Sequence, residues 1–265
     1  MCGIAGYSLS PDSPVGRTLA AQALLAGIAE RGADAVGYAS RGAGQDISVT
    51  KLRGGASALL DEIAVPQHAV HTLIHVRDYT KGRPEITGNN HPIRHGAIVG
   101  IHNGLIENDD ELLDRYGIAR EEPEMTVDSE AIFALMELRQ NDPRGLAELR
   151  GAMATAWLDE REPERLFLAR GVGRPLWLGM TRGALFFAST QRALAIVEAA
   201  LRVRLKKIEV REGRVLDVQD GAIVRQRRFR RDRRYRDDRR LSPVRAPQEA
   251  VFCLQRLASI TSAAA

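Results

Sequence analysis

Cysteine is almost absent from this sequence of 265 residues. Only Cys2 and Cys253 are present, and nearly the whole chain separates them. Two such distant thiols support neither a disulfide framework nor a zinc site built from cysteines. Long apolar runs are also missing, since no segment approaches the roughly 18 apolar residues of a membrane helix, and the start, MCGIAGYSLS, lacks the basic and apolar regions of a secretory signal. We therefore expect a cytoplasmic protein that does not enter a membrane.

An excess of charge of one sign is confined to a single stretch. The net charge is +4, but residues 225–240, RQRRFRRDRRYRDDRR, contribute +7 and leave the rest of the chain at −3. A broad basic face for nucleic acid is therefore not expected. The stretch has three interpretations: a solvated strand edge and linker, a docking surface for an acidic partner or neighbouring subunit, or a nucleic-acid contact. Phe229 and Tyr235 are too few aromatics to establish a stacking platform.

The remaining composition is that of an ordinary folded chain. It is 44% hydrophobic and 27% charged, and we find no repeat of fixed period. Strand-like segments at 2–8 and 34–40 flank an amphipathic helical pattern at 18–32. The second half is richer in strands, with segments 206–218 and 222–229 joined as a hairpin at 219–221. This pattern predicts an α+β fold, a four-layer αββα sandwich of two antiparallel sheets between helical layers.

We divide the chain into two parts. Residues 1–225 form the predicted domain, and residues 226–265 form an arginine-rich linker and C-terminal extension. Within the extension, residues 251–260 have the apolar side of one short helix, which would dock on the body or on another chain.

Cys2 is the most informative residue. Removal of Met1 would give this residue both a thiol and a free α-amine, whose pKa of about 7.7 to 8.0 lets it accept the thiol proton. One residue would then act as nucleophile and base. The alternative is that a small residue after the initiator happens to be cysteine, so the flanking motifs decide between the two.

Six motifs follow one another along the chain: MCGIAGY, LLAGIAERGADAVGYA (24–39), HVRDYTKG (75–82), IHNGLIEN (101–108), TVDSEAI (126–132) and FFASTQRAL (186–194). Together they resemble the class II glutamine amidotransferase domain of the N-terminal nucleophile hydrolases. Their order and spacing are similar to the glutaminase half of glucosamine-6-phosphate synthase. The resemblance covers residues 2 to about 220.

The resemblance implies roles for individual residues. Cys2 would attack the amide of L-glutamine, and the side chain of Asn103 with the backbone N–H of Gly104 would hold the oxyanion, a task that needs preorganised donors. Arg77 would bind the α-carboxylate with its planar fork, and Asp128 the α-ammonium. Thr80 and Gly82 would line the pocket, while three further motif residues would lie near it: Arg31, Gly32 and Asp34. No cofactor or metal is expected.

Each of these residues also has a purely structural interpretation. Asn103-Gly104 is a turn signal at the end of an apolar run, Asp128 is well placed as a helix N-cap, and Arg77 could form a surface ion pair. The four histidines between residues 75 and 102 lack tight metal-ligand spacing, so we interpret them as core or pocket-wall residues: His75, His91, His95 and His102.

The HVRDYTKG segment departs from the pattern of the family, His-Thr-Arg-Trp-Ala-Thr-His-Gly. Asp78 stands where the family has an aromatic residue that helps to gate ammonia, and Lys81 stands where it has a second histidine. Gating is therefore in doubt, although Tyr79 could cover the pocket from the adjacent position.

We predict a glutamine amidohydrolase that works through a γ-glutamyl thioester. The roughly 40 residues beyond 225 are too few for an acceptor domain, so ammonia would pass to a synthase or other protein partner on a separate chain; a homo-oligomer is also open. The alternatives are a stand-alone amidase, a weakened glutamine-sensing module and, more distantly, a nucleic-acid adaptor.

Overall fold

The computed structural model describes residues 2–42, 44, 46–236 and 244–263, which form two antiparallel sheets flanked by helices. From edge to edge, the seven-stranded sheet contains β11 (Lys206–Glu209), β9 (Trp177–Thr181), β10 (Ala184–Ala188), β1 (Gly3–Leu9), β4 (Ala69–Arg77), β2 (Ala35–Gly42) and β3 (Ser48–Arg53). The six-stranded sheet contains β13 (Ala222–Arg228), β12 (Arg214–Gln219), β8 (Leu166–Arg170), β7 (Gly151–Asp159), β6 (Ile98–Ile106) and β5 (Ile93–His95).

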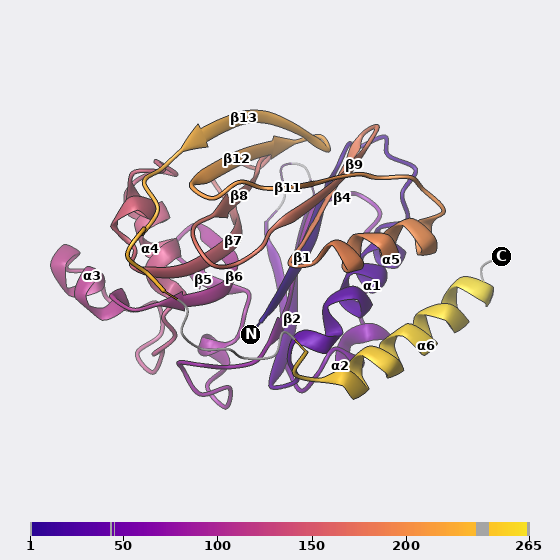
Figure 1. Ribbon diagram of the computed structural model, residues 1–265, viewed down its shortest axis with the longest axis horizontal. Coiled ribbons are helices and arrows are strands. Elements are labelled where there is room, and N and C mark those ends of the chain that lie inside the picture. Colours follow the sequence, from indigo (N-terminus) through magenta and orange to yellow (C-terminus); the bar gives the residue numbers. More distant parts are fainter. Residues whose placement is uncertain (1, 43, 45, 237–243, 264–265) are drawn as a thin grey trace.

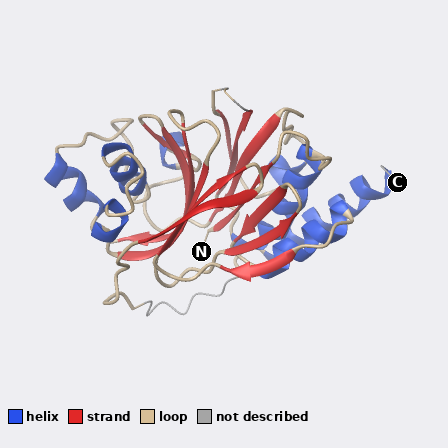
Figure 2. Cartoon of the chain, turned by 90° about the horizontal axis from the view of Figure 1, so that it is seen from above, coloured by secondary structure: helices blue, strands red, loops and turns tan. Residues whose placement is uncertain are grey.

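Helices cover the outer faces of both sheets. The α-helices are α1 (Arg17–Ile28), α2 (Ser57–Leu60), α3 (Asp109–Tyr116), α4 (Glu130–Leu138), α5 (Gln191–Leu201) and α6 (Pro247–Ala263), and the 3₁₀ turns are η1 (Ala29–Arg31), η2 (Thr87–Asn89) and η3 (Gly145–Glu148). Figure 1 shows α1, α2, α5 and α6 on one side and α3 and α4 on the other, and Figure 2 shows the strands between these two groups. This arrangement confirms the predicted αββα sandwich.

Alternation along the strands explains the layers. In β1, Ile4 packs into the core between the two sheets, while Ala5, Tyr7 and Leu9 pack beneath the helices of the seven-stranded sheet. A third core lies under α4 and includes Trp157 of β7. One strand thus contributes to two cores, as a face-to-face sandwich requires.

Three local predictions were wrong or incomplete. Helix α1 is buried nearly all round from Ala20 to Ile28, because α5 and α6 pack on the side that an amphipathic helix would expose. The segment 206–218 is two strands in different sheets, broken by Gly213, whose φ is +72°. The C-terminal helix α6 extends beyond 251–260 in both directions.

The predicted hairpin at 219–221 is confirmed. Gln219 and Ala222 face each other in the β12–β13 ladder, and Asp220 and Gly221 between them both have positive φ. Two central residues of this kind are typical of the turn that matches strand twist.

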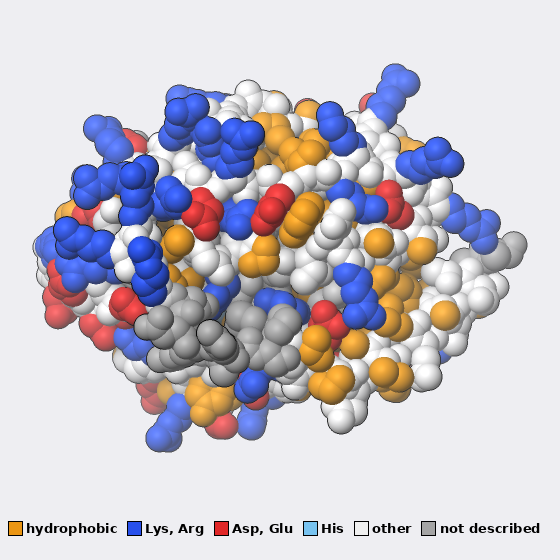
Figure 3. Space-filling view, viewed as in Figure 1, with side chains coloured by type: hydrophobic (Ala, Val, Ile, Leu, Met, Phe, Trp, Pro, Cys, Tyr) orange, Lys and Arg blue, Asp and Glu red, His pale blue; other side chains and the backbone are white. Residues whose placement is uncertain are grey.

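The arginine-rich stretch begins in β13, an edge strand of the six-stranded sheet. Arg227 pairs with Asp217 at 2.7 Å and Arg231 with Glu212 at 2.6 Å, so part of its charge is neutralised by the body. Lys and Arg side chains gather at the upper left of Figure 3, over β13 and α4. Phe229 is half-buried against the core under α4, which limits its use as a stacking surface. Residues 237–240 of this stretch lie outside the described residues.

Candidate active site

Strand periodicity brings three of the predicted site residues to the gap between the sheets. Ile4 of β1 and Leu73 of β4 belong to the core between the sheets, as does Ile101 of β6. Because side chains alternate, Cys2, Arg77 and Asn103 lie on the same faces as these three residues. Gly3 pairs with Val76, so the start of β1 lies beside the end of β4. The start of β1 accordingly lies in the middle of the molecule in Figure 1.

The Cys2 thiol lies beside the segment that follows β4. Its S–H donates to the carbonyl oxygen of Asp78 at 3.5 Å, and the Nε–H of Arg31 donates to the carbonyl oxygen of Cys2, also at 3.5 Å. Burial raises the pKa of the Cys2 thiol, while the nearby Arg77 guanidinium acts to lower it. A β-carbon at Gly3 would lie 2.8 Å from a methyl of Val76. The Cys2 thiol thus lies at a tightly packed strand end, where burial favours its protonated form.

Gly32 and Asp34 hold the segment after Arg77 in place. A β-carbon on Gly32 would lie 2.2 Å from the carbonyl oxygen of Arg77, so no other residue fits there. The backbone N–H of Asp34 donates to that same carbonyl at 3.0 Å, and its carboxylate accepts from the N–H of Tyr79 at 2.8 Å. Both motif residues act on the loop beside Cys2.

Arg77 is buried and already engaged by its own loop. Its guanidinium donates to Asn90 Oδ1 at 2.5 Å and to the carbonyl oxygens of Lys81 at 2.9 Å and Gly82 at 2.5 Å. These bonds use three of five N–H donors. The interpretation of Arg77 as a surface ion pair is therefore wrong, because the side chain is only 2% exposed. Thr80, in contrast, is exposed on the loop.

Asn103 and Gly104 do not form a turn. They lie within β6, opposite Ala154 and Met153 of β7. Gly104 has a φ of +155°, and a β-carbon there would lie 1.9 Å from the carbonyl oxygen of Ala152, so this strand position requires glycine. The side chain of Asn103 is fully buried, and neither its nitrogen nor its oxygen has a hydrogen-bond partner among the described residues. Such an amide is available to a ligand in the gap.

The predicted N-cap role of Asp128 is wrong. Ser129 precedes the first residue of α4, and no side chain caps that helix end. The Asp128 carboxylate instead accepts from the N–H of Ile106 at 2.7 Å, which ties it to β6. Burial raises the pKa of Asp128 to about 6; the Ile106 N–H opposes this shift, nearby Asp109 adds to it, and Lys81 opposes it.

Sequence reasoning missed the residues that fix β6 behind Asn103. His102 Nε2 lies 3.2 Å from the carbonyl oxygen of Ala152, which can only accept, so this nitrogen carries the proton. Its Nδ1 then accepts from the hydroxyl of Ser129 at 2.8 Å. The HNG and DSE motifs are therefore joined by one hydrogen bond. His102 and Ser129 stand next to Asn103 and Asp128 in the sequence, and this adjacency is the signal that could have pointed to their hydrogen bond.

Two further contacts had no signal in the sequence. Asn89 Oδ1 accepts from the N–H groups of Thr126 and Val127 at 2.8 and 3.0 Å, which ties the loop after Arg77 to the segment before Asp128. Lys81 forms ion pairs with Asp109 at 2.6 Å and Asp110 at 2.9 Å. A lysine where the family has histidine thus anchors the loop to the start of α3.

The four histidines lie in the protein interior or at its margin. His75 and His91 stack with ring centroids 4.1 Å apart, and burial lowers the pKa of both. His95 Nδ1 lies 3.0 Å from Glu130. Across the described residues, no group of three or more potential ligand side chains is arranged to hold a metal ion. In the same part of the chain, no helix combines the length and apolarity needed to span a bilayer.

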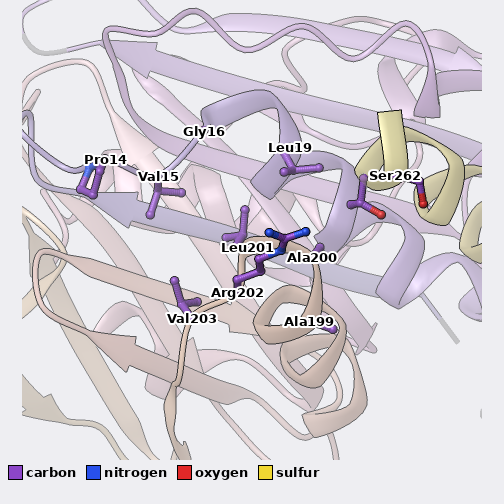
Figure 4. Close-up of a pocket in the computed structure, with 11 residues that line it drawn as sticks. Pro14, Val15, Gly16, Leu19, Ala199, Ala200, Leu201, Arg202, Val203 and Ser262 are labelled. Carbon is purple, nitrogen blue, oxygen red and sulfur yellow. The ribbon is translucent and has the colours of Figure 1, made fainter. Parts of the chain in front are cut away.

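A separate surface pocket lies between the start of α1, the end of α5 and the end of α6 (Figure 4). Its lining contains no acid, histidine or cysteine and none of the predicted site residues. The pocket therefore has no chemistry in common with the Cys2 site.

Comparison with known proteins points to the family that the motifs resemble. Residues 82–196 match the family model of a glutamine amidotransferase domain. The chain is 32% identical to glutamine–fructose-6-phosphate aminotransferase (isomerizing) of Shigella flexneri over 232 residues, which is 82% of this chain and 35% of the relative. The same enzyme of Escherichia coli strain K12 is 32% identical over 233 residues, with the same coverage. The chain thus spans about a third of the length of these relatives.

Solved structures share the fold. Glutamine phosphoribosylpyrophosphate (PRPP) amidotransferase from B. subtilis, complexed with ADP and GMP, aligns with a TM-score of 0.68 and 20% identity, covering 86% of this chain and 49% of that one. A structure described as the allosteric regulatory enzyme of purine biosynthesis aligns with a TM-score of 0.67 and 21% identity over the same shares of the two chains. The motifs, the fold and these matches together show that the chain belongs to the class II glutamine amidotransferase domains of the N-terminal nucleophile type.

Proposed function

We propose that this protein hydrolyses the side-chain amide of L-glutamine, with Cys2 as nucleophile, and delivers ammonia to an acceptor enzyme on a separate chain. In this proposal residues 1–225 carry the glutaminase, and residues 226–265 form an extension. Removal of Met1 is required, because only then is the α-amine of Cys2 free.

The observation that carries the proposal is the Asn103 side chain. It is fully buried between the sheets without a partner among the described residues. Leaving a buried amide unpaired costs about 1 to 3 kcal/mol, so such a group is expected where a ligand completes it. An oxyanion formed at the amide carbon of glutamine would accept the N–H of Asn103 and that of Gly104.

The chemistry then balances with groups of this chain. The α-amine takes the thiol proton as Sγ attacks the amide carbon, and the carbonyl electrons move onto the oxyanion. When the intermediate collapses, the C–N bond breaks and the amine returns the proton to the leaving nitrogen, which departs as ammonia. Water, deprotonated by the same amine, attacks the γ-glutamyl thioester; the C–S bond breaks, the amine returns its proton to the Cys2 sulfur, and glutamate leaves.

Arg77 and Asp128 supply the charges that would hold a free amino acid. The charges of Cys2 and Asp128 both act on the pKa of the Arg77 guanidinium, so the three groups are electrostatic neighbours. Three of the five Arg77 donors are in use, two on carbonyl oxygens of the 78–82 loop and one on Asn90, so two donors of the same guanidinium are left for the α-carboxylate. A cation and an anion that both face one ligand favour a zwitterion.

A glutamine-sensing module is the second candidate. Burial raises the pKa of the Cys2 thiol, and its proton is held on the Asp78 carbonyl, which favours binding over attack. In that case glutamine binds but releases no ammonia.

Product release by the purified, Met1-processed protein tests the proposal. We expect glutamate and ammonia from L-glutamine in equal amounts, none with Cys2→Ser, and unchanged release with Cys253→Ser, whose thiol is buried in the core beneath the helices of the seven-stranded sheet. Stimulation on adding the acceptor enzyme would support the separate chain. Glutamine binding without product would favour the sensor, and equal turnover by Cys2→Ser would contradict both the nucleophile and the thioester.

A further inference from the structure

The carboxylate of Asp78 lies on the residue after Arg77, where the α-carboxylate of glutamine would bind. Asp78 directly follows Arg77, and its carbonyl oxygen accepts the Cys2 thiol proton at 3.5 Å. Its side chain is only 18% exposed. A bare carboxylate here would repel the α-carboxylate of glutamine and oppose formation of the thiolate. The position therefore needs a compensating cation.

The C-terminal segment supplies one. Arg245 Nε lies 3.2 and 3.4 Å from the two carboxylate oxygens of Asp78, across a separation of 167 residues. This single N–H is shared between both oxygens, so the carboxylate is neutralised at the point where the loop leaves β4. The cation comes from outside the six motifs.

The backbone of this segment is fixed independently of the Arg245 side chain. The N–H groups of Arg245 and Ala246 both donate to the carbonyl oxygen of Glu30, at 2.8 and 3.0 Å. Glu30 is adjacent to Arg31, which donates to Cys2. The segment thus contacts Glu30 through its backbone and Asp78 through the Arg245 side chain.

Helix α6 then locks the segment onto the body. Glu249 accepts from the N–H of Ser57 at 2.8 Å and from its hydroxyl at 3.0 Å. Cys253 and Leu257 are buried in the core that covers the seven-stranded sheet. Figure 1 shows α6 along the outer side of α1 and α2. Helix α6 is packed against the body, and this holds Arg245, two residues before the helix begins, beside Asp78.

We propose that Arg245 is a positioning residue of the glutaminase site, which acts through Asp78 to hold the 78–82 loop and to neutralise its acid beside Cys2. The expected effect of Arg245 on glutamine binding rests on the proposed function. Its expected effect on the Cys2 thiol does not depend on that function. We thereby assign the C-terminal extension to the active site rather than to a linker alone.

The charged groups that face the thiol define the expected pH effect. They are Arg31 and Arg77, which favour the thiolate, Asp78, which opposes it, and the α-amine of the processed chain. Removing Arg245 takes away the positive charge that it places on the Asp78 carboxylate, so the pH at which Cys2 becomes reactive rises.

The experiment measures two quantities in Arg245→Gln, Arg245→Lys, Asp78→Asn and the double variant Asp78→Asn/Arg245→Gln. One is the pH dependence of Cys2 alkylation by iodoacetamide, followed by intact mass; the other is KM and kcat for glutamine. The matched control is Arg256→Gln, which removes an ion pair between α6 and Asp61, 2.8 Å apart.

For Arg245→Gln we expect the alkylation profile to move to higher pH and KM to rise about two- to fivefold, as for a partly exposed ion pair. Arg245→Lys restores both, and with Asp78→Asn present the Arg245 substitution has no further effect. Arg245→Gln behaving like Arg256→Gln in both measurements overturns the inference. A shifted alkylation profile in a protein that releases no glutamate supports the role of Arg245 while rejecting the glutaminase.

Discussion

His75 Nε2 lies 3.1 Å from the carbonyl oxygen of His102, the residue before Asn103. Because a carbonyl can only accept, this nitrogen carries the ring proton. Burial lowers the pKa of His75 to about 3, so the ring is neutral at any ordinary assay pH. This bond joins β4, which ends at Arg77, to β6, which carries the proposed oxyanion donor.

His75→Ala should therefore impair both folding and catalysis. It leaves a buried carbonyl unpaired and opens a cavity, so we expect the free energy of unfolding to fall by about 2 to 4 kcal/mol. We also expect kcat to fall by about tenfold, because Asn103 is less well placed. Urea denaturation and glutamate release measure the two effects. The exposed His68→Ala is the control, and an unchanged kcat in the His75 variant would show that the inter-sheet bond does not position Asn103.

Asn103→Ala separates catalysis from stability. Removing an oxyanion donor should lower kcat by about 10²- to 10³-fold, while KM changes little. Stability should not fall by more than about 1 kcal/mol, since the side chain has no partner among the described residues to lose. Steady-state kinetics and thermal unfolding test this pair of expectations. A strongly destabilised protein that keeps its kcat would refute the assignment of Asn103.

The raised pKa of Asp128 predicts that glutamine binding depends on pH. Its pKa is raised to about 6 by burial, so the carboxylate that would hold the ammonium is lost as pH falls through about 6. KM should rise below that pH in the wild type, whereas Asp128→Asn should have a KM at least tenfold higher that no longer varies there. A wild-type KM that stays flat from pH 7.5 to 5 would be inconsistent with this role.

The raised pKa of Asp128 also affects the stability of the fold, with a pH dependence opposite to that of glutamine binding. A carboxyl with a folded pKa above its unfolded value favours the folded state at low pH, and this contribution is lost as pH rises through about 6. Asp128→Asn should therefore unfold less readily than wild type at pH 7, by about 1 to 3 kcal/mol, with the difference disappearing near pH 4. Urea denaturation at the two pH values checks the sign, and destabilisation at pH 7 would contradict it.

Lys81, on the loop that follows β4, affects the pKa of the Asp128 carboxylate. Its ammonium lowers the pKa of Asp128 and pairs with the buried Asp109. Lys81→Gln should therefore move the rise in KM to higher pH. Asp110→Asn removes only the exposed partner of Lys81 and should move it less. KM profiles of the two variants would coincide if Lys81 had no electrostatic effect on Asp128.

Local pattern was enough to predict the layers, whereas the grouping of Cys2, Arg77 and Asn103 in one site came from the resemblance to the family. Alternation in β1, β4 and β6 determines which side chains face the gap, and that information is contained in short segments. The turn assigned to Asn103-Gly104 failed because the close approach of the Ala152 carbonyl demands glycine within a strand. A propensity cannot distinguish these two uses of glycine.

Contacts between distant segments were beyond the reach of the pattern. The carboxylate of Asp128 is drawn to β6 by the N–H of Ile106 and not to its own helix. The pairing of Asp78 with Arg245 depends on how α6 packs against α1. Neither contact could be predicted from the periodicity of the sequence or from a short motif.

The most direct test of the central claim is the intact mass and peptide map of the protein after incubation with 6-diazo-5-oxo-norleucine, an electrophilic analogue of glutamine. We predict a chain that has lost Met1 and gained one adduct, located on Cys2, with L-glutamine protecting against it. A chain that retains Met1, or an adduct elsewhere than on Cys2, would contradict the account.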